Sequence, residues 1–463
     1  MNSFCNKFFG DKNFYKTVLK IALPIIIQNG ITNFVSLLDN IMIGKLGTEP
    51  MSGASIVNQL VFIYYLCIFG AVSGAGIFTA QYYGKGDYEG VKHSFRYKLW
   101  LGLILCIATI LVFIYAQTPL INAYLKSEPD VKNAELALKY GQQYITIILF
   151  SLPAFFITQT YASTLRECGK TLLPMIAAAI SVFTNLALNY VLIYGKFGLP
   201  ALGVEGAAIA TVIARYIELL VVVIFTHVRK KVYPFCVGIY RTLRVPAHIV
   251  KAIFIKGTPL LINETLWATG MALINQCYAT RGLNVVAGLN IATTINNVFN
   301  IVFVAMGDCI AIIVGQHLGA NEMKRAKETA TKLITFSVLV SILIAVIMFF
   351  TAPAFPKMFN TNEDARNIGR MLIICYAIFM PQAAFLHASY FTLRSGGKTI
   401  ITFLFDSVFI LCVSYAVAFI LSRTTALSAI ALFVIVQACD SIKSIVGFVL
   451  VKKGIWLNNI VSE

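Results

Sequence analysis

Charged side chains are scarce in this sequence. Lys, Arg, Asp and Glu make up 12% of the 463 residues, whereas 58% are apolar and the mean hydropathy is +0.79. An ordinary soluble domain carries about twice that share of charged residues. The composition therefore excludes a typical soluble domain and predicts an integral membrane protein.

Cysteine and histidine do not form the patterns of a metal site or a disulfide framework. The ten cysteines run from Cys5 to Cys439 without a CxxC pair, and there are only five histidines. Zinc sites and disulfide-rich domains require such residues at short, regular spacing. No cofactor is therefore expected. A membrane enzyme, which needs clustered acids or histidines at one membrane face, is also disfavoured.

A nucleotide-binding loop is missing too, although two similar segments end in GKT. These are TLRECGKT (Thr164–Thr171) and TLRSGGKT (Thr392–Thr399). A phosphate loop needs a glycine five residues before its last glycine, and threonine stands there in both copies. We interpret both segments as turns that Arg and Lys anchor at lipid head groups, with Gly169 and Gly397 allowing the reversal. The sequence therefore predicts no nucleotide-driven activity.

Long apolar runs are plentiful, and they predict twelve spanning helices. A hydrocarbon core of about 30 Å requires about 20 apolar residues per helix. The polar, basic stretch 229–250 separates two sets of six, so we expect lobes at 1–228 and 251–463 joined by a cytoplasmic linker. The fold class is therefore all-α. The predicted helices lie near 16–43, 54–83, 95–116, 141–165, 172–195, 204–227, 249–278, 285–317, 333–353, 369–393, 400–422 and 427–451.

Lys and Arg concentrate in alternate connections. Most of them lie near the N-terminus, in the even-numbered loops and after the last helix. The positive-inside rule then places both termini in the cytoplasm, which agrees with an even number of helices. Basic loops that face anionic lipid account for much of the formal charge of +17, so no nucleic-acid partner is expected.

The two halves repeat each other. A shift of 235 residues pairs Pro24 with Pro259 and Gly84 with Gly319, and a shift of 228 pairs the two GKT segments. Six helices per half is an even number, so the halves share one orientation in the membrane. The substrate is expected to bind between them.

Ionisable side chains inside spans are candidates for function, because each costs about 3 kcal/mol on insertion scales. Arg215 with Glu218, and Asp440 with Lys443, lie three residues apart, and we interpret both as ion pairs along one helix face. The ionisable residues without a partner nearby in sequence, for which structural and functional roles both stay open, are Asp308, Asp406 and His387.

Asp39 ranks first among these candidates because it ends a polar stripe on the first helix, and such a stripe lines water or a polar partner. Upstream, Pro24 removes a backbone hydrogen bond from the same helix and is predicted to act as a hinge. On the fifth helix, Asn185 and Asn189 share a face and offer amide groups to a cation or a carboxyl. The other members of the stripe are Thr32, Ser36 and Asn40.

The C-terminal half carries a second polar wall. Glu264 lies near the middle of the seventh helix, five residues after Pro259. On the eighth helix, one face gathers the polar residues Asn290, Thr293, Thr294, Asn297 and Asn300.

Together these features resemble the MATE family, the multidrug and toxic compound extrusion transporters, over nearly the whole chain. The resemblance implies a twelve-helix antiporter of the cell membrane that exchanges H⁺ or Na⁺ for small organic, often cationic, substrates by alternating access. We expect it to act as a monomer. The segments that carry the similarity are ALP (22–24), LLDNIMIGKLG (37–47), QYYGKGD (81–87), GQHLGANE (315–322), both GKT segments and NLALNYVLIYGKFGLPALGVEGAAIAT (185–211).

The resemblance also implies site residues. Asp39 matches the acid that carries the coupling ion in relatives, and the positions around it match Asn185, Asn189, Ala207 and Thr211. No metal ligands are expected beyond Asp39, Asn185 and Asn189, which would hold Na⁺ if sodium is the coupling ion. Some relatives have Asp at the position of Asn189, so the choice between H⁺ and Na⁺ stays open.

Other relatives pair an acid that matches Glu264 with an aspartate on the tenth helix, where this chain has Gln382. We therefore rank Asp39 above the second-lobe cavity. The alternative function is a lipid-linked precursor flippase of the same superfamily, which would need cationic side chains in the cavity to hold pyrophosphate. The second-lobe cavity is expected to comprise Glu264, Asn290, Thr294, Asn297 and Gln382.

Overall fold

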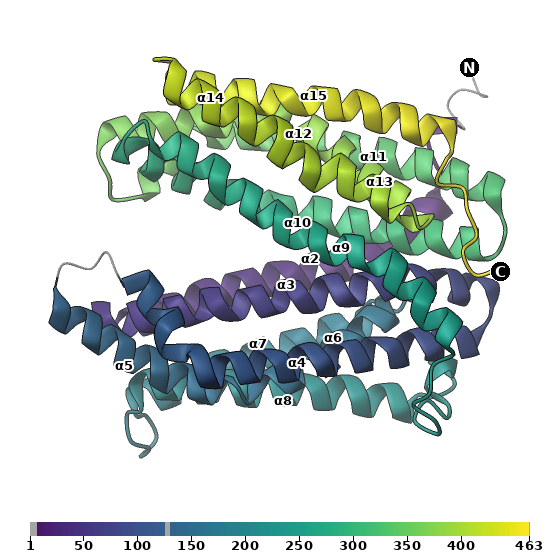
Figure 1. Ribbon diagram of the computed structural model, residues 1–463, viewed down its shortest axis with the longest axis horizontal. Coiled ribbons are helices and arrows are strands. Elements are labelled where there is room, and N and C mark those ends of the chain that lie inside the picture. Colours follow the sequence, from purple (N-terminus) through teal and green to yellow (C-terminus); the bar gives the residue numbers. More distant parts are fainter. Residues whose placement is uncertain (1–6, 126–129, 463) are drawn as a thin grey trace. The chain divides into compact units, whose positions relative to one another are not determined.

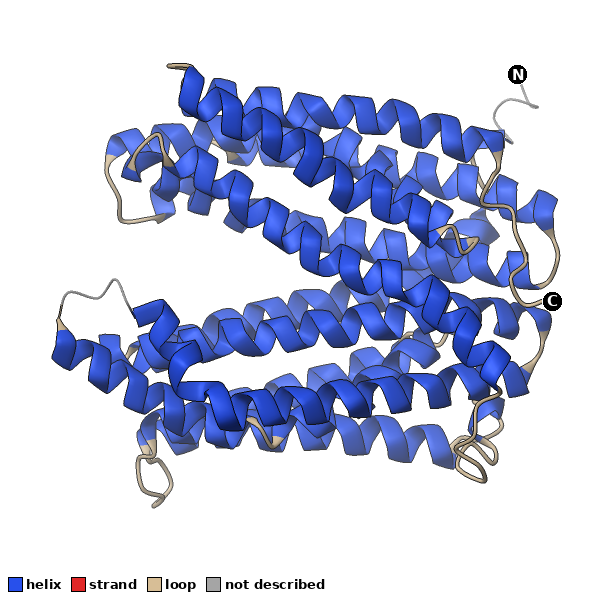
Figure 2. Ribbon diagram, viewed as in Figure 1, coloured by secondary structure: helices blue, strands red, loops and turns tan. Residues whose placement is uncertain are grey.

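The computed structural model describes residues 7–125 and 130–462, with the backbone alone at 35–37, and these ranges contain helices but no strand (Figures 1 and 2). The all-α prediction is confirmed. The helices of the first half are α2 (Lys12–Gly44), α3 (Thr48–Lys85), α4 (Tyr88–Leu125), α5 (Val131–Ile148), α6 (Ser151–Glu167), α7 (Leu172–Tyr194) and α8 (Gly203–Val228).

The second half follows a connection that contains the short 3-10 helix η1 (Pro234–Cys236). One of its helices is interrupted by two π-helical stretches, η3 (Leu404–Val408) and η4 (Ile410–Tyr415). The other elements are α9 (Ala247–Ala279), α10 (Leu283–Gly319), α11 (Met323–Thr351), η2 (Phe355–Met358), α12 (Glu363–Ser395), α13 (Thr399–Phe403), α14 (Ala416–Thr424) and α15 (Ala429–Lys453).

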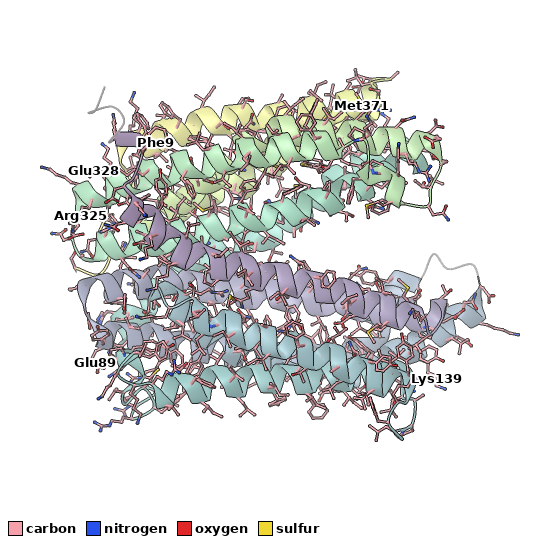
Figure 3. All side chains as sticks on the ribbon, turned by 180° about the vertical axis from the view of Figure 1, so that it is seen from behind. Phe9, Glu89, Lys139, Arg325, Glu328 and Met371 are labelled. Carbon is pink, nitrogen blue, oxygen red and sulfur yellow. The ribbon has the colours of Figure 1, made fainter. Side chains whose placement is uncertain are left out.

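Within the described ranges, ten helices are long and apolar enough to cross a membrane, counting 399–424 as one. Helices α5 and α6 pass the same test together and bend by 49° where they meet. The remaining predicted span, the seventh at 249–278, is α9, which has 33 residues but carries polar groups such as Lys256, Asn263 and Glu264. Near the start of α11, the charged side chains of Arg325 and Glu328 are exposed (Figure 3).

The chain divides into two compact units. Unit 1 comprises Met1–Leu23, Ala80–Asp87 and Phe254–Glu463, and unit 2 comprises Pro24–Thr79 and Tyr88–Ile253. The divisions fall inside α2, α3 and α9, so each of these helices contributes to both units. The lobe boundaries at 228 and 251 stay a prediction.

Each unit has its own apolar core. In unit 2, α8 packs against α5, α6 and α7, around buried residues such as Tyr64 and Leu152. In unit 1, α12 packs against α10, α11 and α15, around Leu372 and Leu432. Both cores are built from side chains of several helices, as close packing of apolar groups requires.

Glycines permit the two predicted turns and also one close approach between helices. Gly169 and Gly397 have φ of 72° and 73°, a left-handed conformation that favours glycine, so the predicted reversals at both GKT segments are confirmed. Within unit 1, a Cβ at Gly84 would meet the Gln316 backbone, and a Cβ at Gly319 would meet the Gln81 backbone. The ends of α3 and α10 therefore touch through a pair of repeat-related glycines.

The segment after α15 folds back over this contact in unit 1. Gln81 Nε2 donates to the Asn458 carbonyl at 3.2 Å, and Lys85 Nζ donates to the Val461 carbonyl at 2.8 Å. Trp456, on the same segment, is 1% exposed. The C-terminal segment is thus part of the core of unit 1.

Candidate ion-coupling site

Asp39 and Asn189 are joined directly in unit 2. Asn189 Nδ2, on α7, donates to Asp39 Oδ1, on α2, at 2.6 Å. Asn189 is 1% exposed and Asp39 is half-buried. The short bond is typical of a charge-assisted hydrogen bond to a carboxylate. A half-buried carboxyl within a spanning helix is thus held by a neutral amide.

Asn185 lies one helical turn before Asn189 and extends the network toward α8. Asn189 Nδ2 lies 3.1 Å from Asn185 Oδ1, and the Asn185 amide lies 3.3 Å from Thr211 Oγ1. With its amide turned end for end, Asn185 places its nitrogen 2.9 Å and 3.2 Å from the two Asp39 oxygens and accepts from Thr211. That orientation gives the Asp39 carboxylate a second donor, but it places the amide nitrogens of Asn185 and Asn189 3.1 Å apart, whereas the first orientation lets Thr211 accept from Asn185.

Thr211 donates to the Ala207 carbonyl at 3.0 Å, one turn earlier on α8. Ala207 is 2% exposed and contributes backbone and a small side chain. Asp39, Asn185, Asn189, Ala207 and Thr211 therefore form one connected group on three helices of unit 2. The structure brings together all five residues that the sequence assigns to this site.

The charge of Asp39 has no opposite partner at contact distance among the described residues. Arg215, one turn after Thr211 on α8, pairs instead with Glu218 at 3.0 Å, as predicted. Its guanidinium also lies 5.3 Å from the centre of the Phe155 ring. Because Arg215 is held by another acid and an aromatic face, no lysine or arginine in the described ranges contacts the Asp39 carboxylate.

One oxygen beside the carboxylate is unused. Asn189 Oδ1 is buried and accepts no hydrogen bond in the part of the chain that the structure describes. A buried amide oxygen without a partner is costly. Together with Asp39 it supplies the carboxylate and amide oxygens that hard cations such as Na⁺ favour.

The rest of the first-helix stripe is less informative. Thr32 and Asn40 are exposed, and the side chain of Ser36 lies outside the described residues. Pro24 sits inside α2, and the division between unit 1 and unit 2 falls between Leu23 and Pro24.

The second-lobe residues are not assembled in the same way. Glu264 is half-buried on α9, and Gln382 donates to the Gln437 carbonyl at 3.4 Å and accepts from Ser441 at 3.2 Å. No hydrogen bond or ion pair in the described ranges links Glu264 to Gln382. The exposed members of the α10 face are Asn290, Thr294, Asn297 and Asn300.

The predicted pairing of Asp440 with Lys443 is wrong. Lys443 Nζ instead lies 2.8 Å from Asp406 Oδ1, across from α15 to η3. Three-residue spacing brings two side chains within reach, but a carboxylate on a neighbouring helix competes for the same ammonium group. Asp406 thereby gains a partner that sequence spacing could not show.

A second buried pair escaped the sequence analysis. Lys98 on α4, whose side chain is 0% exposed, pairs with Glu167 at the end of α6 and donates to Ser163 and Thr164. The predicted helix 95–116 contains Lys98, but the sequence analysis assigns it no partner. Its place at the edge of an apolar run, opposite the acid of TLRECGKT, was the only available signal.

The comparisons with known proteins agree with this architecture. A family model described as MatE matches residues 24–191 and again 259–421. Probable multidrug resistance protein NorM of Thermotoga maritima is 24% identical over 88% of this chain and 86% of its own. Probable multidrug resistance protein YoeA of Bacillus subtilis is 24% identical over 91% of this chain and 89% of its own.

Among solved structures, the MATE transporter VcmN of Vibrio cholerae superimposes with a TM-score of 0.85 at 17% identity, covering 95% of this chain and 97% of its own. Solved structures of this kind have twelve helices in two lobes, so the predicted twelve-helix, two-lobe fold class is confirmed.

Proposed function

Because this chain belongs to the MatE family of multidrug and toxic compound extrusion transporters, a family of multi-pass membrane proteins, we propose that it exports organic cations in exchange for Na⁺ or H⁺. The names of its relatives as multidrug resistance proteins support small organic molecules as substrates. Family membership also makes it a transporter and not an enzyme.

The observation that carries this proposal is the neutral environment of Asp39. A carboxylate that amides hold without a counter-cation can take up and release one positive charge. An antiporter needs such a group, since the coupling ion and a cationic substrate must alternate. Asp39 binds the coupling ion, and Asn185, Asn189 and Thr211 position the carboxylate.

Alternation between two accessible states also needs a part that bends. The division of the chain into units falls at Pro24, a residue that lacks a backbone N–H and weakens α2 there. Bending at Pro24 is proposed to couple the ion on Asp39 to the rocking of the two lobes.

No observation favours a lipid-linked precursor flippase. A flippase would need unpaired cationic side chains to hold the pyrophosphate of its substrate. The most deeply buried lysines in the described ranges, Lys98 and Lys443, are each held by a carboxylate.

The test uses purified protein in sealed vesicles, with H⁺ and Na⁺ gradients imposed separately and a cationic dye as substrate. Dye should move against its gradient with one of the two ions and without ATP. A strict requirement for ATP while both ion gradients are clamped would contradict the proposal.

A further inference from the structure

Unit 1 contains a carboxylate group of the same composition as the Asp39 site. Asn263 Nδ2, on α9, donates to Asp406 Oδ2 at 3.1 Å, and Ser407 Oγ donates to Asn263 Oδ1 at 2.7 Å. Asn263 is 2% exposed and Ser407 is 0% exposed. A carboxylate, an amide and a hydroxyl thus meet in the interior of unit 1, as they do in unit 2.

The two groups differ in what lies on the carboxylate. The Lys443 ammonium contacts Asp406 at 2.8 Å, and only 8% of the Lys443 side chain is exposed. It also lies 5.5 Å from the centre of the Phe405 ring. By contrast, Asp39 has no ammonium or guanidinium at contact distance within the described ranges.

The repeat explains how this difference arises. A shift of 228 residues, the same that pairs the GKT segments, pairs Arg215 with Lys443. Each lobe therefore carries a cationic side chain at the same place on its sixth helix. In unit 2 that cation turns to Glu218 on its own helix, whereas in unit 1 it crosses to the carboxylate at Asp406.

Stability alone does not account for the Asp406–Lys443 pair. Desolvation offsets most of the attraction within a buried ion pair, so an apolar replacement of both partners is often neutral. Asp406 also lies in a π-helical stretch, a rare conformation that is frequent at functional sites. An ammonium group on carboxylate oxygen occupies the position of a bound monovalent cation.

We propose that Asp406, positioned by Asn263 and Ser407, forms a second monovalent-cation site, and that the Lys443 ammonium occupies it as a tethered substitute for Na⁺. Asp406 provides the charged ligand, and Asn263, which donates to the other carboxylate oxygen and accepts from Ser407, holds that carboxylate in place. With Lys443 in place the site exchanges no ion, so the coupling ion binds to Asp39 alone. Only this last consequence rests on the proposed function.

Removal of the tethered cation should open the site. Three variants of the full-length chain are compared: D39N, D39N/K443Q and D39N/K443Q/D406N. All three lack the Asp39 carboxylate, so none can bind a cation there. Equilibrium binding of radioactive Na⁺ is measured in detergent with choline as the competing control cation. D39N should bind at background, D39N/K443Q should bind about one Na⁺ per chain because one carboxylate is freed, and the third variant should return to background. Equal binding by D39N and D39N/K443Q, or binding that survives D406N, would overturn the proposal.

If K443Q alone does not give folded protein, the stability of the double variant K443Q/D406N tests the proposal instead. K443Q/D406N leaves no uncompensated charge, so its thermal unfolding midpoint should lie well above that of either single variant. A double variant no more stable than K443Q would show that Lys443 does not serve as the cation of Asp406. None of these readouts involves transport, so they can fail while the role of Asp39 stands, and the reverse also holds.

Discussion

At Asp39, the balance of charge decides which ion can bind. The carboxylate is the only charged group among the five connected residues, and its contacts are amides. A proton neutralises it outright, whereas Na⁺ needs additional oxygen ligands such as the unused Asn189 Oδ1. Any change that adds negative charge beside Asp39 should therefore favour Na⁺ over a proton.

Asn189→Asp is the most direct such change. The added carboxylate supplies further charged oxygen ligands beside Asp39, which Na⁺ needs and a proton does not, so Na⁺-driven efflux should rise several-fold relative to H⁺-driven efflux. Initial rates of dye efflux in vesicles under each gradient measure the ratio. Asn13→Asp, an exposed position near the start of α2, is the matched control and should leave the ratio unchanged. The same shift in both variants would mean that added charge acts at a distance.

Part of this site could be predicted from the sequence. Four-residue spacing places Asn185 and Asn189 on one face of α7, and a polar stripe marks Asp39. The Asp406–Lys443 contact could not be predicted, because the partners are 37 residues apart and one lies in a π-helical stretch. Spacing rules describe neighbours on one regular helix, and this contact joins two helices, one of them irregular.

Among the helices, α2 joins the candidate site to the division between the units. Its residues before Pro24 belong to unit 1, and those from Pro24 onward belong to unit 2. Proline leaves the carbonyl one turn earlier without its usual partner, which lowers the cost of bending there. The helix that carries Asp39 thus lacks one backbone hydrogen bond at the point where it enters unit 2, and it bends more easily there.

Pro24→Ala restores that backbone donor, and we expect it to slow efflux by roughly tenfold, equivalent to about 1.4 kcal/mol in the barrier. The thermal unfolding midpoint should not fall, because alanine favours a helix. Pro119→Ala in α4, a helix that lies wholly within unit 2, is the control. Efflux at the normal rate in Pro24→Ala would show that bending at Pro24 is not needed for transport.

The segment after α15 makes a different prediction. Trp456 is 1% exposed, so Trp456→Ala should lower the free energy of unfolding by about 3–5 kcal/mol through lost burial and a cavity. Trp267 on α9 is 42% exposed, so Trp267→Ala is the matched control. It should lower the free energy of unfolding by less than about 0.5 kcal/mol. Denaturant titration in detergent compares the two. Equal losses would show that the segment is not packed as described.

Helices were predicted more reliably than their irregularities. The fourth predicted span, 141–165, was drawn as one helix, whereas α5 and α6 bend by 49° between Ile148 and Ser151. Hydropathy reports how apolar a run is, and that property is the same in a straight and a bent helix. The π-helical stretches inside 399–424 escaped prediction for the same reason.

For the whole molecule, the distribution of basic residues predicts which loops face the cytoplasm. The connection that contains Lys230 should lie inside, and the connection before α12 that contains Thr361 should lie outside. Single cysteines at these two positions, tested in intact cells with an impermeant thiol reagent, decide this. We expect labelling of Thr361→Cys and not of Lys230→Cys.

The native Cys236 lies in the same connection as Lys230. Burial raises the pKa of its thiol to about 12, so it should stay unreactive at neutral pH, and its removal is a precaution. Labelling at 230 without labelling at 361 would invert the topology.

The repeat and its divergence together describe how the molecule is built. Two copies of one six-helix frame keep the GKT turns and the Gly84–Gly319 contact, while the carboxylates inside the lobes have different partners. The frame could be predicted because repeated turns need fixed residues such as glycine. The difference in chemistry depends on which side chains meet across helices, and one sequence does not show this.

The central claim is that Asp39 is the coupling carboxylate. The most direct measurement compares gradient-driven dye efflux in vesicles for Asp39→Asn and Glu264→Gln, with the amount of folded protein determined for both. Asp39→Asn keeps the shape of the side chain and removes its charge, so coupled efflux should be abolished, whereas Glu264→Gln should have a milder effect because no hydrogen bond or ion pair in the described ranges links Glu264 to Gln382. Normal coupling in Asp39→Asn together with an inactive Glu264→Gln would move the site to the C-terminal lobe and contradict the account.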